Sequence, residues 1–242
     1  MRRARAETAD GIVEGRYDES AGTVEADGET YRLGADADLL PPCEGAVYTI
    51  GYNYPDYTEM HLEADEPPEP FGFSLKAPVS VRASGEPVPY PSFSEELGYG
   101  GELTVVIGEE CKNVPERDVD DVLAGYTILN DLLATDQETV GTMKVFDGSA
   151  PIGPCVATDL DPADLDIRTT INGEVRQDAS TAAMTQSPAE IVSELSRRCT
   201  LQPGDVIALG SPANPGTVEP GDEIECWYEG IGTLRTTIVE PS

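Results

Sequence analysis

The sequence predicts a mixed α+β fold in which β-strands dominate. Short runs that alternate between apolar and polar residues recur along the chain, and turn residues separate them. The clearest of these runs are 166–171, 206–209, 223–228 and 234–239. Helix signals are few and short. The length of 242 residues favours a small N-terminal β-rich domain at 1–42, followed by one larger domain at 43–242.

The N-terminal domain is expected to contain a β-hairpin. Asp27-Gly28 separates two short β-like runs, 23–25 and 30–33, and type I′ hairpin turns prefer this dipeptide. The stretch 39–43, which contains two prolines, interrupts the pattern and marks the domain boundary. Residues 61–70 are charged and rich in proline, so they are expected to form an exposed loop rather than a core element.

Two helices are expected in the larger domain. Residues 113–116 open a short helix that runs through Leu123, with Gly125 as its stop. Ser187-Pro-Ala-Glu combines a capping box with proline at the first helical position, so a second helix is expected from 188 to about 198. Asn172-Gly173 predicts a tight hairpin turn after a strand.

The charge of the chain excludes several classes of partner. It has 46 acidic and 15 basic residues, a formal net charge of −31, which would repel nucleic acids and anionic membranes. A hydrophobic content of 39% is sufficient for a packed core. The acids are spread along the whole chain, and lysine is scarce. This composition is typical of a salt-adapted protein of haloarchaeal type, in which molar salt screens self-repulsion.

The cysteines and the N-terminus indicate an intracellular protein. The five cysteines are odd in number and show no C-x-x-C spacing, so they predict neither a disulfide framework nor a zinc site. We expect buried, reduced thiols. No apolar run follows the basic N-terminus, and no apolar stretch of about 18 residues occurs, so the predicted location is the cytoplasm.

Two acids stand in apolar surroundings. Glu102 precedes the apolar run 103–107, and Asp131 ends the run 125–130, with Lys144 farther along. Buried acids are costly unless they are paired or bound to a cation, so the pattern indicates a divalent metal held by oxygen ligands. The alternative is an edge strand on which Glu102 faces water.

These segments resemble the fumarylacetoacetate hydrolase family. The matching motifs include Tyr48-Thr-Ile-Gly-Tyr-Asn-Tyr-Pro-Asp, Phe73-Ser-Leu-Lys-Ala-Pro, the segments of 96–154 and Glu229-Gly-Ile-Gly-Thr-Leu-Arg. The resemblance implies a β-roll or distorted barrel of mixed strands with a few short helices, a homodimer, and Mg²⁺ or Mn²⁺ as cofactor. It also implies a small-molecule carboxylate as substrate, of the 2-oxo-acid type.

The resemblance also implies roles for single residues, and the chain departs from the family at several of them. Glu102 and Asp131 are the implied metal ligands, whereas Gly100 stands where the family has a first carboxylate. The implied substrate-binding residues are Lys76, Ser211 and Glu138. Thr135 replaces an expected arginine.

The catalytic candidates are Lys144, Tyr57 and His61. Tyr57 stands at the position of the family's catalytic histidine, and His61, the single histidine of the chain, follows four residues later. If this segment coils into a helix, both side chains share a face. His61 is then either an exposed lid residue or a general base. Tyr57 or Lys144 suffices as a proton donor for tautomerisation or decarboxylation, and these reactions suit the remaining residues better than C–C hydrolysis.

Two functional classes follow from the sequence. The first is a metal-assisted enzyme that acts on 2-oxo acids or on substrates of the 2-hydroxydienoate or acylpyruvate type. The second is a catalytically silent family member that serves as a dimeric binding or structural protein. The changes at Gly100, Tyr57 and Thr135 favour the second class, and the retained Glu102 and Asp131 favour the first.

Overall fold

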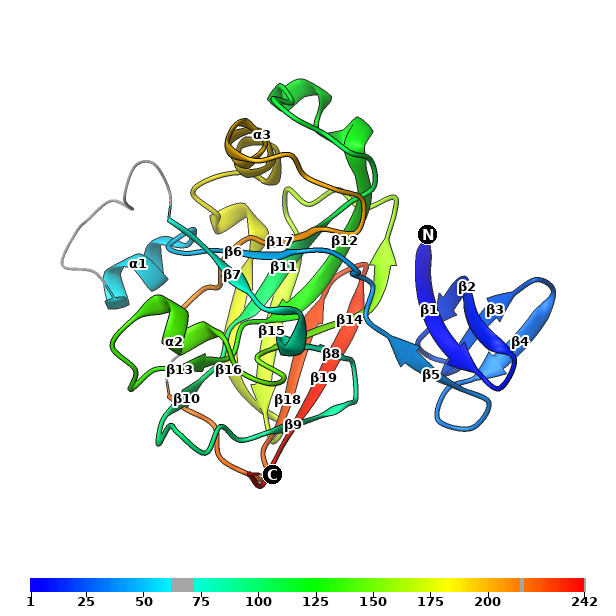
Figure 1. Cartoon of the computed structure of the whole chain (residues 1–242), viewed down its shortest axis with the longest axis horizontal. Coiled ribbons are helices and arrows are strands. Elements are labelled where there is room, and N and C mark those ends of the chain that lie inside the picture. The colour runs from blue at the N-terminus through cyan, green and yellow to red at the C-terminus, as the bar shows by residue number, and fades with distance from the viewer. Residues whose placement is uncertain (62–71, 214–215, 242) are drawn as a thin grey trace.

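The computed structural model describes residues 1–61, 72–213 and 216–241. Its main element is a twelve-stranded mixed sheet in the order β4-β3-β2-β1-β14-β12-β11-β17-β6-β7, with β5 beside β1 and β8 beside β14 (Figure 1). These strands are β1 Arg2–Thr8, β2 Gly11–Asp18, β3 Thr23–Ala26, β4 Glu29–Arg32, β5 Ala37–Leu40, β6 Val47–Ile50, β7 Phe73–Lys76, β8 Val81–Ala83, β11 Gly101–Ile107, β12 Leu123–Asn130, β14 Ala150–Ala157 and β17 Val206–Ala208.

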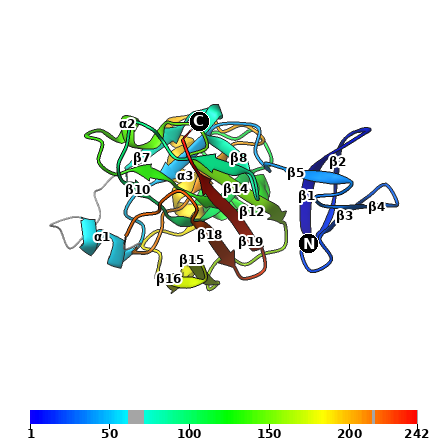
Figure 2. The same cartoon turned by 90° about the horizontal axis from the view of Figure 1, so that it is seen from below.

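A five-stranded sheet packs beneath the large one in the order β16-β15-β18-β19-β9 (Figure 2). Its strands are β9 Pro87–Pro89, β15 Asp166–Ile171, β16 Glu174–Ser180, β18 Glu223–Tyr228 and β19 Gly232–Val239. A short ribbon pairs β10 Leu97–Gly98 with β13 Leu133–Ala134. The described α-helices are α1 Pro55–His61, α2 Val140–Lys144 and α3 Pro188–Arg198. The predicted mainly β, mixed fold is confirmed, although no sheet in the described part closes into a barrel.

The N-terminal strands β1–β5 form one end of the large sheet and stand to one side of the molecule (Figure 1). They join the rest of the sheet through the pairing of β1 with β14, at Arg2 and Arg3, and Glu19 adds an ion pair with Arg235. The predicted hairpin is confirmed, because β3 and β4 pair across Asp27 and Gly28, whose φ angles are 52° and 83°. The division into two domains stays a prediction.

Strand β11 runs through the interior and carries Glu102. It pairs with β12 on one side and with β17 on the other, and all seven of its residues are buried. Glu102 itself is 3% exposed. The alternative of an edge strand whose acid faces water is therefore wrong.

The helix expected from 113 to 123 is absent. This segment forms two 3₁₀ turns, Glu116–Asp118 and Asp120–Val122, neither of which has a side-chain cap at its start. Gly125 is no helix stop but part of β12, with a φ of 142°. A Cβ there would collide with the carbonyl of Ala157 on the neighbouring β14. The close approach of two strands therefore explains this glycine.

The C-terminal half follows the expected pattern closely. Helix α3 starts with the predicted capping box, in which Ser187 Oγ accepts from the Glu190 amide and the Glu190 carboxylate accepts from the Ser187 amide. The hairpin at Asn172-Gly173 is also confirmed, with φ angles of 51° and 80° between β15 and β16. The expected strands correspond to β15, β17, β18 and β19.

Three smaller expectations can be compared with the structure. His61 ends α1, and the rest of the loop expected at 61–70 lies outside the described residues. The cysteines are free thiols, and all but the half-buried Cys199 are buried. Among the described residues, no helix has the length and apolarity that a membrane crossing requires.

The net charge of −31 generates a prediction about stability. The melting temperature should rise steadily between about 0.1 and 3 M KCl, because shortening the Debye length from about 10 Å to below about 3 Å weakens self-repulsion. Circular dichroism melts measure this, with sucrose of equal osmolality as the uncharged control. A melting temperature that stays flat in KCl would contradict the salt-adapted interpretation.

Candidate active site

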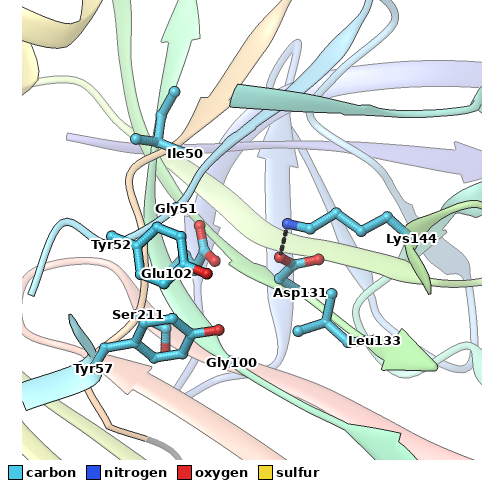
Figure 3. Close-up of a pocket in the computed structure, with 10 residues that line it drawn as sticks. All are labelled: Ile50, Gly51, Tyr52, Tyr57, Gly100, Glu102, Asp131, Leu133, Lys144 and Ser211. Carbon is cyan, nitrogen blue, oxygen red and sulfur yellow. Dashed lines mark hydrogen bonds and ion pairs between the residues drawn. The ribbon is translucent and has the colours of Figure 1, made fainter. Parts of the chain in front are cut away.

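A pocket opens at the start of β11, where segments from distant parts of the chain meet (Figure 3). The residues that line it are Ile50, Gly51, Tyr52, Tyr57, Gly100, Glu102, Asp131, Leu133, Lys144 and Ser211. The carboxylates of Glu102 and Asp131 therefore face one pocket, with the Lys144 ammonium beside them. The sequence motifs that contain them are brought together by the pairing of β11 with β12.

Asp131 lies between two lysines. Its Oδ1 is 2.7 Å from Lys76 Nζ, and its Oδ2 is 2.6 Å from Lys144 Nζ. Lys144 Nζ also donates to Thr49 Oγ1 at 2.8 Å. Burial favours the neutral carboxyl, but the charges of Lys144 and Lys76 outweigh it and hold the pKa of Asp131 below its usual range. Asp131 is therefore ionised and held on both sides.

Lys76 lies beneath the pocket and does not line it. None of its side chain is exposed, and besides Asp131 it donates to the carbonyl oxygens of Leu132 at 2.7 Å and Ser149 at 2.9 Å. Burial lowers the pKa of Lys76 to about 8. All of its donors are occupied by the protein, so the structure gives Lys76 a role in holding Asp131 rather than the expected direct contact with substrate.

Glu102, unlike Asp131, has no ion pair with a cation among the described residues. Its Oε2 accepts from the Gly210 amide at 2.9 Å. Burial, and next the charge of Asp131, raise the pKa of Glu102 to about 8. A carboxyl group in this state binds either a proton or a cation, and near neutrality the unliganded pocket holds the proton.

These two acids fit a divalent ion. Mg²⁺ commonly uses one or two carboxylates and keeps several waters, and oxygen ligands also suit Mn²⁺. In the described part of the chain, no group of three or more metal-binding side chains occurs, in keeping with Gly100 at the position of a third ligand. A metal ion here would be held by Glu102 and Asp131. Asp131 would then give up its contact with one of the two lysines.

Ser211 is oriented by Gln177, a residue that the sequence analysis missed. Gln177 Nε2 donates to Ser211 Oγ at 2.7 Å and to the Pro212 carbonyl at 2.9 Å, while Gln177 Oε1 accepts from the Gly101 amide. Ser211 Oγ in turn donates to the Pro212 carbonyl at 3.1 Å. Because its oxygen already accepts a bond from Gln177, the hydroxyl can donate to a ligand by exchanging its bond to the Pro212 carbonyl.

The burial of Gln177 had no signal in the sequence because it depends on an irregularity of the sheet. The pairing of β15 with β16 shifts between Thr169 and Thr170, so Thr169 faces Gln177 while Thr170 faces Val175. On one strand, Val175 is 54% exposed and Gln177 only 3%. The bulge reverses the inside and the outside faces, which alternation alone assigns wrongly.

Helix α1 places Tyr57 in the wall of the pocket. His61 follows one turn later on the same face, with ring centroids 4.3 Å apart, as expected for a helical coil. His61 is exposed and does not line the pocket. Burial, and then the charges of Asp131 and Glu102, raise the pKa of Tyr57 well above its usual value. Its phenol therefore stays protonated across the physiological range.

Glu138 is not brought into the pocket. It is exposed, as is Thr135, which donates to Glu96 through its hydroxyl. The neighbouring Asp136 accepts from Ser94 Oγ at 2.6 Å and fixes this turn at the surface. The structure thus differs from the expectation that Glu138 contacts substrate.

The fold consists of mixed sheets, and two acids and a lysine line its pocket. Comparison with known proteins identifies the family that has this fold. Residues 46–239 match the fumarylacetoacetate (FAA) hydrolase C-terminal family model. The chain belongs to the fumarylacetoacetate hydrolase family.

Two solved structures show the closeness of the fold. The 5-carboxymethyl-2-hydroxymuconate delta-isomerase from Mycobacterium smegmatis is 33% identical, with a TM-score of 0.90 and coverage of 100% of both chains. The fumarylpyruvate hydrolase from Pseudomonas aeruginosa, in complex with Mn²⁺ and pyruvate, is 28% identical, with a TM-score of 0.76 over 93% of this chain and 98% of that one.

A relative by sequence is the 4-hydroxyphenylacetate degradation bifunctional isomerase/decarboxylase of Escherichia coli. It is 37% identical over 208 residues, which cover 83% of this chain and 48% of that protein. The chain thus spans about half the length of this relative. The named relatives are enzymes, and they include isomerase, decarboxylase and hydrolase activities.

The raised pKa of Glu102 generates a prediction about pH. The folded protein holds a proton on Glu102 up to about pH 8, whereas the unfolded chain releases it near its ordinary value, so this stability is lost as pH rises from about 5 to about 9. Glu102→Gln mimics the protonated acid and should remove this loss. Melting temperatures measured in EDTA should therefore fall with pH more steeply for the wild type than for the variant.

Adding Mn²⁺ at pH 8.5 gives the control. The ion should restore the melting temperature of the wild type and leave Glu102→Gln nearly unchanged, because the amide is a poor ligand. Parallel pH profiles for the two proteins would contradict the assignment of the titrating group.

Proposed function

We propose that the chain is a metal-assisted enzyme acting on 2-oxo acids or on substrates of the 2-hydroxydienoate or acylpyruvate type. Isomerisation, tautomerisation or decarboxylation is favoured over C–C hydrolysis. The observation that carries this proposal is the convergence of Glu102, Asp131, Lys144 and Ser211 on one pocket that also holds a protonated phenol. Mg²⁺ or Mn²⁺ held by Glu102 and Asp131 would supply Lewis-acid stabilisation of a developing enolate.

The residues of the chain have separate roles in this proposal. Ser211 donates its hydroxyl to the substrate carboxylate, in the orientation set by Gln177. Lys144 brings a compact positive charge to the enolate oxygen as negative charge develops there. Tyr57 holds a proton at its phenol oxygen and delivers it to the substrate carbon or oxygen. Asp131, held by Lys76, fixes the position of Lys144.

Hydrolysis is less well supported because, with Glu102 and Asp131 assigned to the metal, no suitable base lines the pocket among the described residues. A water molecule that attacks a ketone must lose a proton to a base whose pKa is near the working pH. Tyr57 holds its proton too tightly for this role, and His61 lies outside the pocket lining. Proton delivery to an enolate asks for a donor, which Tyr57 provides.

A catalytically silent binding protein is the second candidate. It is favoured by Gly100 at a ligand position of the family and by the exposed Thr135 in place of an arginine. In either case we propose a homodimer, because edge strand β7 exposes Phe73 and Leu75 and contacts α2, which exposes Val140. Apolar side chains gathered at a free sheet edge are unusual on the surface of a monomer.

Substitution at the metal ligand tests the enzyme proposal. Asp131→Asn keeps the shape but removes a charge, so turnover of 2-oxo acids should fall at least about a hundredfold, with partial recovery in excess Mn²⁺. His61→Gln serves as the matched control and should change turnover less than about twofold. The assay follows oxaloacetate decarboxylation and exchange of the C3 protons of pyruvate in D₂O by NMR.

Gly100→Glu separates the two functional classes. It returns a third carboxylate and should tighten Mn²⁺ binding in calorimetry. Wild-type protein that turns over no substrate, combined with activity in Gly100→Glu/Tyr57→His, would establish the silent relative. If His61→Gln alone abolished turnover, that result would instead support the hydrolytic mechanism with a histidine base.

Gln177 should act through Ser211, and a double-mutant cycle measures this. Gln177→Met and Ser211→Ala should each weaken pyruvate binding by about fivefold, as expected for one hydrogen bond. The double variant should bind no more weakly than Ser211→Ala, because the amide then has nothing to orient. Additive losses in calorimetry, accompanied by an equal fall in melting temperature in both backgrounds, would show a purely structural role.

A further inference from the structure

We propose that the pocket selects 2-oxo acids whose tail beyond C3 is neutral and apolar, and that it rejects substrates with a further carboxylate at the distal end of that tail. This inference rests on the proposed function and narrows its substrate class. It follows from three features of the described structure: the supply of cations, the charge of the pocket rim and the character of the walls.

Apart from the proposed metal ion, the described part of the protein offers the pocket a single cation. Lys144 is the one cation among its described lining residues, and Lys76 lies beneath it with all donors occupied. Asp131 already takes one contact from each lysine. The sequence of the remaining segments, 62–71 and 214–215, contains neither lysine nor arginine. A second carboxylate would enter without a partner, at the cost of its desolvation.

The rim beyond Leu133 is acidic. In the β10–β13 ribbon Leu133 pairs with Gly98, and two residues farther out the Thr135 amide donates to the Glu96 carbonyl at 3.0 Å. At the rise of a strand, Thr135 lies about 7 Å from Leu133 along the ribbon. Its hydroxyl is 3.3 Å from Glu96 Oε2, and Asp136 follows directly. A distal carboxylate leaving the pocket along this side would meet like charges.

The walls suit an uncharged tail instead. Figure 3 shows the rings of Tyr52 and Tyr57 on one side of the pocket and Leu133 on the other. Tyr52 is held in a left-handed conformation, with a φ of 62°, and its ring lies 5.7 Å from that of Tyr57. The ring faces and the Leu133 side chain gain from covering an apolar group, and none of them carries a positive charge that could pair with a carboxylate.

Two acids that differ at one end provide the test. 2-Oxopentanoate and 2-oxoglutarate have the same chain length, and the second bears a distal carboxylate in place of a methyl group. Calorimetry with Mn²⁺ present should show that the wild type binds 2-oxopentanoate at least about tenfold more tightly, because like charges at a binding site oppose association. Equal or tighter binding of 2-oxoglutarate would overturn the inference and leave the proposed function standing.

A pair of variants assigns the preference to the rim. Thr135→Arg/Glu96→Gln introduces a cation where the acidic rim stood and should gain affinity for 2-oxoglutarate by about tenfold, with 2-oxopentanoate little changed. Thr135→Gln/Glu96→Gln also places a long polar side chain at position 135 but is neutral, and its gain should be clearly smaller. Equal gains in affinity for 2-oxoglutarate in both variants would contradict the inference that a missing cation causes the rejection. Binding of neither acid by the wild type, with or without Mn²⁺, would remove the proposed function and this inference together.

Discussion

The buried contact of Asp131 with two lysines is the interaction on which the site depends. Removing one partner of such a group leaves an uncompensated charge in the interior, at a cost of about 3–5 kcal/mol. The network also joins separate parts of the fold. Lys76 comes from β7, Lys144 ends α2, and the bond from Lys144 reaches Thr49 on β6. Because Lys76 also binds the carbonyls of Leu132 and Ser149, it fixes the backbone on both sides of the pocket floor.

Strand β11 supplies the second acid of this network, Glu102, and places it in the interior of the protein. The strand lies between two neighbours and is buried on both faces, so a carboxylate at position 102 cannot reach bulk water. The Gly210 amide binds one of its oxygens, and Gln177 connects the adjacent Gly101 to Ser211. The loop at 210–212 is thus tied to the start of β11 by two hydrogen-bonded connections. The same contact between the two sheets therefore positions Ser211, the proposed donor to the substrate carboxylate, and Glu102, the proposed metal ligand.

The sequence predicted those features that are set by local chemistry. The capping box at Ser187, the hairpin at Asn172 and the strands with regular alternation are fixed within a few residues, and all are present. The pairing of Glu102 and Asp131 in one pocket was also predictable, because each ends an apolar run that must be buried. Features that depend on partners far along the chain were not. Gly125 is required by the close approach of β14, and Gln177 is turned inward by a bulge on β16.

Lys76 and Glu138 show the same limit within the site. A lysine is the least expected residue to be buried completely, and Lys76 tolerates this because three oxygen atoms surround its ammonium group. None of the three is its neighbour in sequence. Glu138 was placed by its position in a motif, whereas the turn around Asp136 holds this part of the chain at the surface. Motif position predicts the place of a residue on the chain, and the packing of the turn decides where its side chain points.

The protein as a whole is strongly negative, whereas Lys144 in the pocket is positive. The salt concentration sets which of these charges dominates for an approaching anion. A carboxylate that approaches a protein of net charge −31 is repelled over a distance set by the Debye length. At about 1 M salt this length is about 3 Å, so acids scattered over the surface no longer act on a ligand at the pocket mouth. Lys144 and Asp131 are shielded from ions by burial, and their fields inside the pocket persist. Salt that screens self-repulsion in the fold would therefore also permit the proposed anionic substrate to reach the lysine.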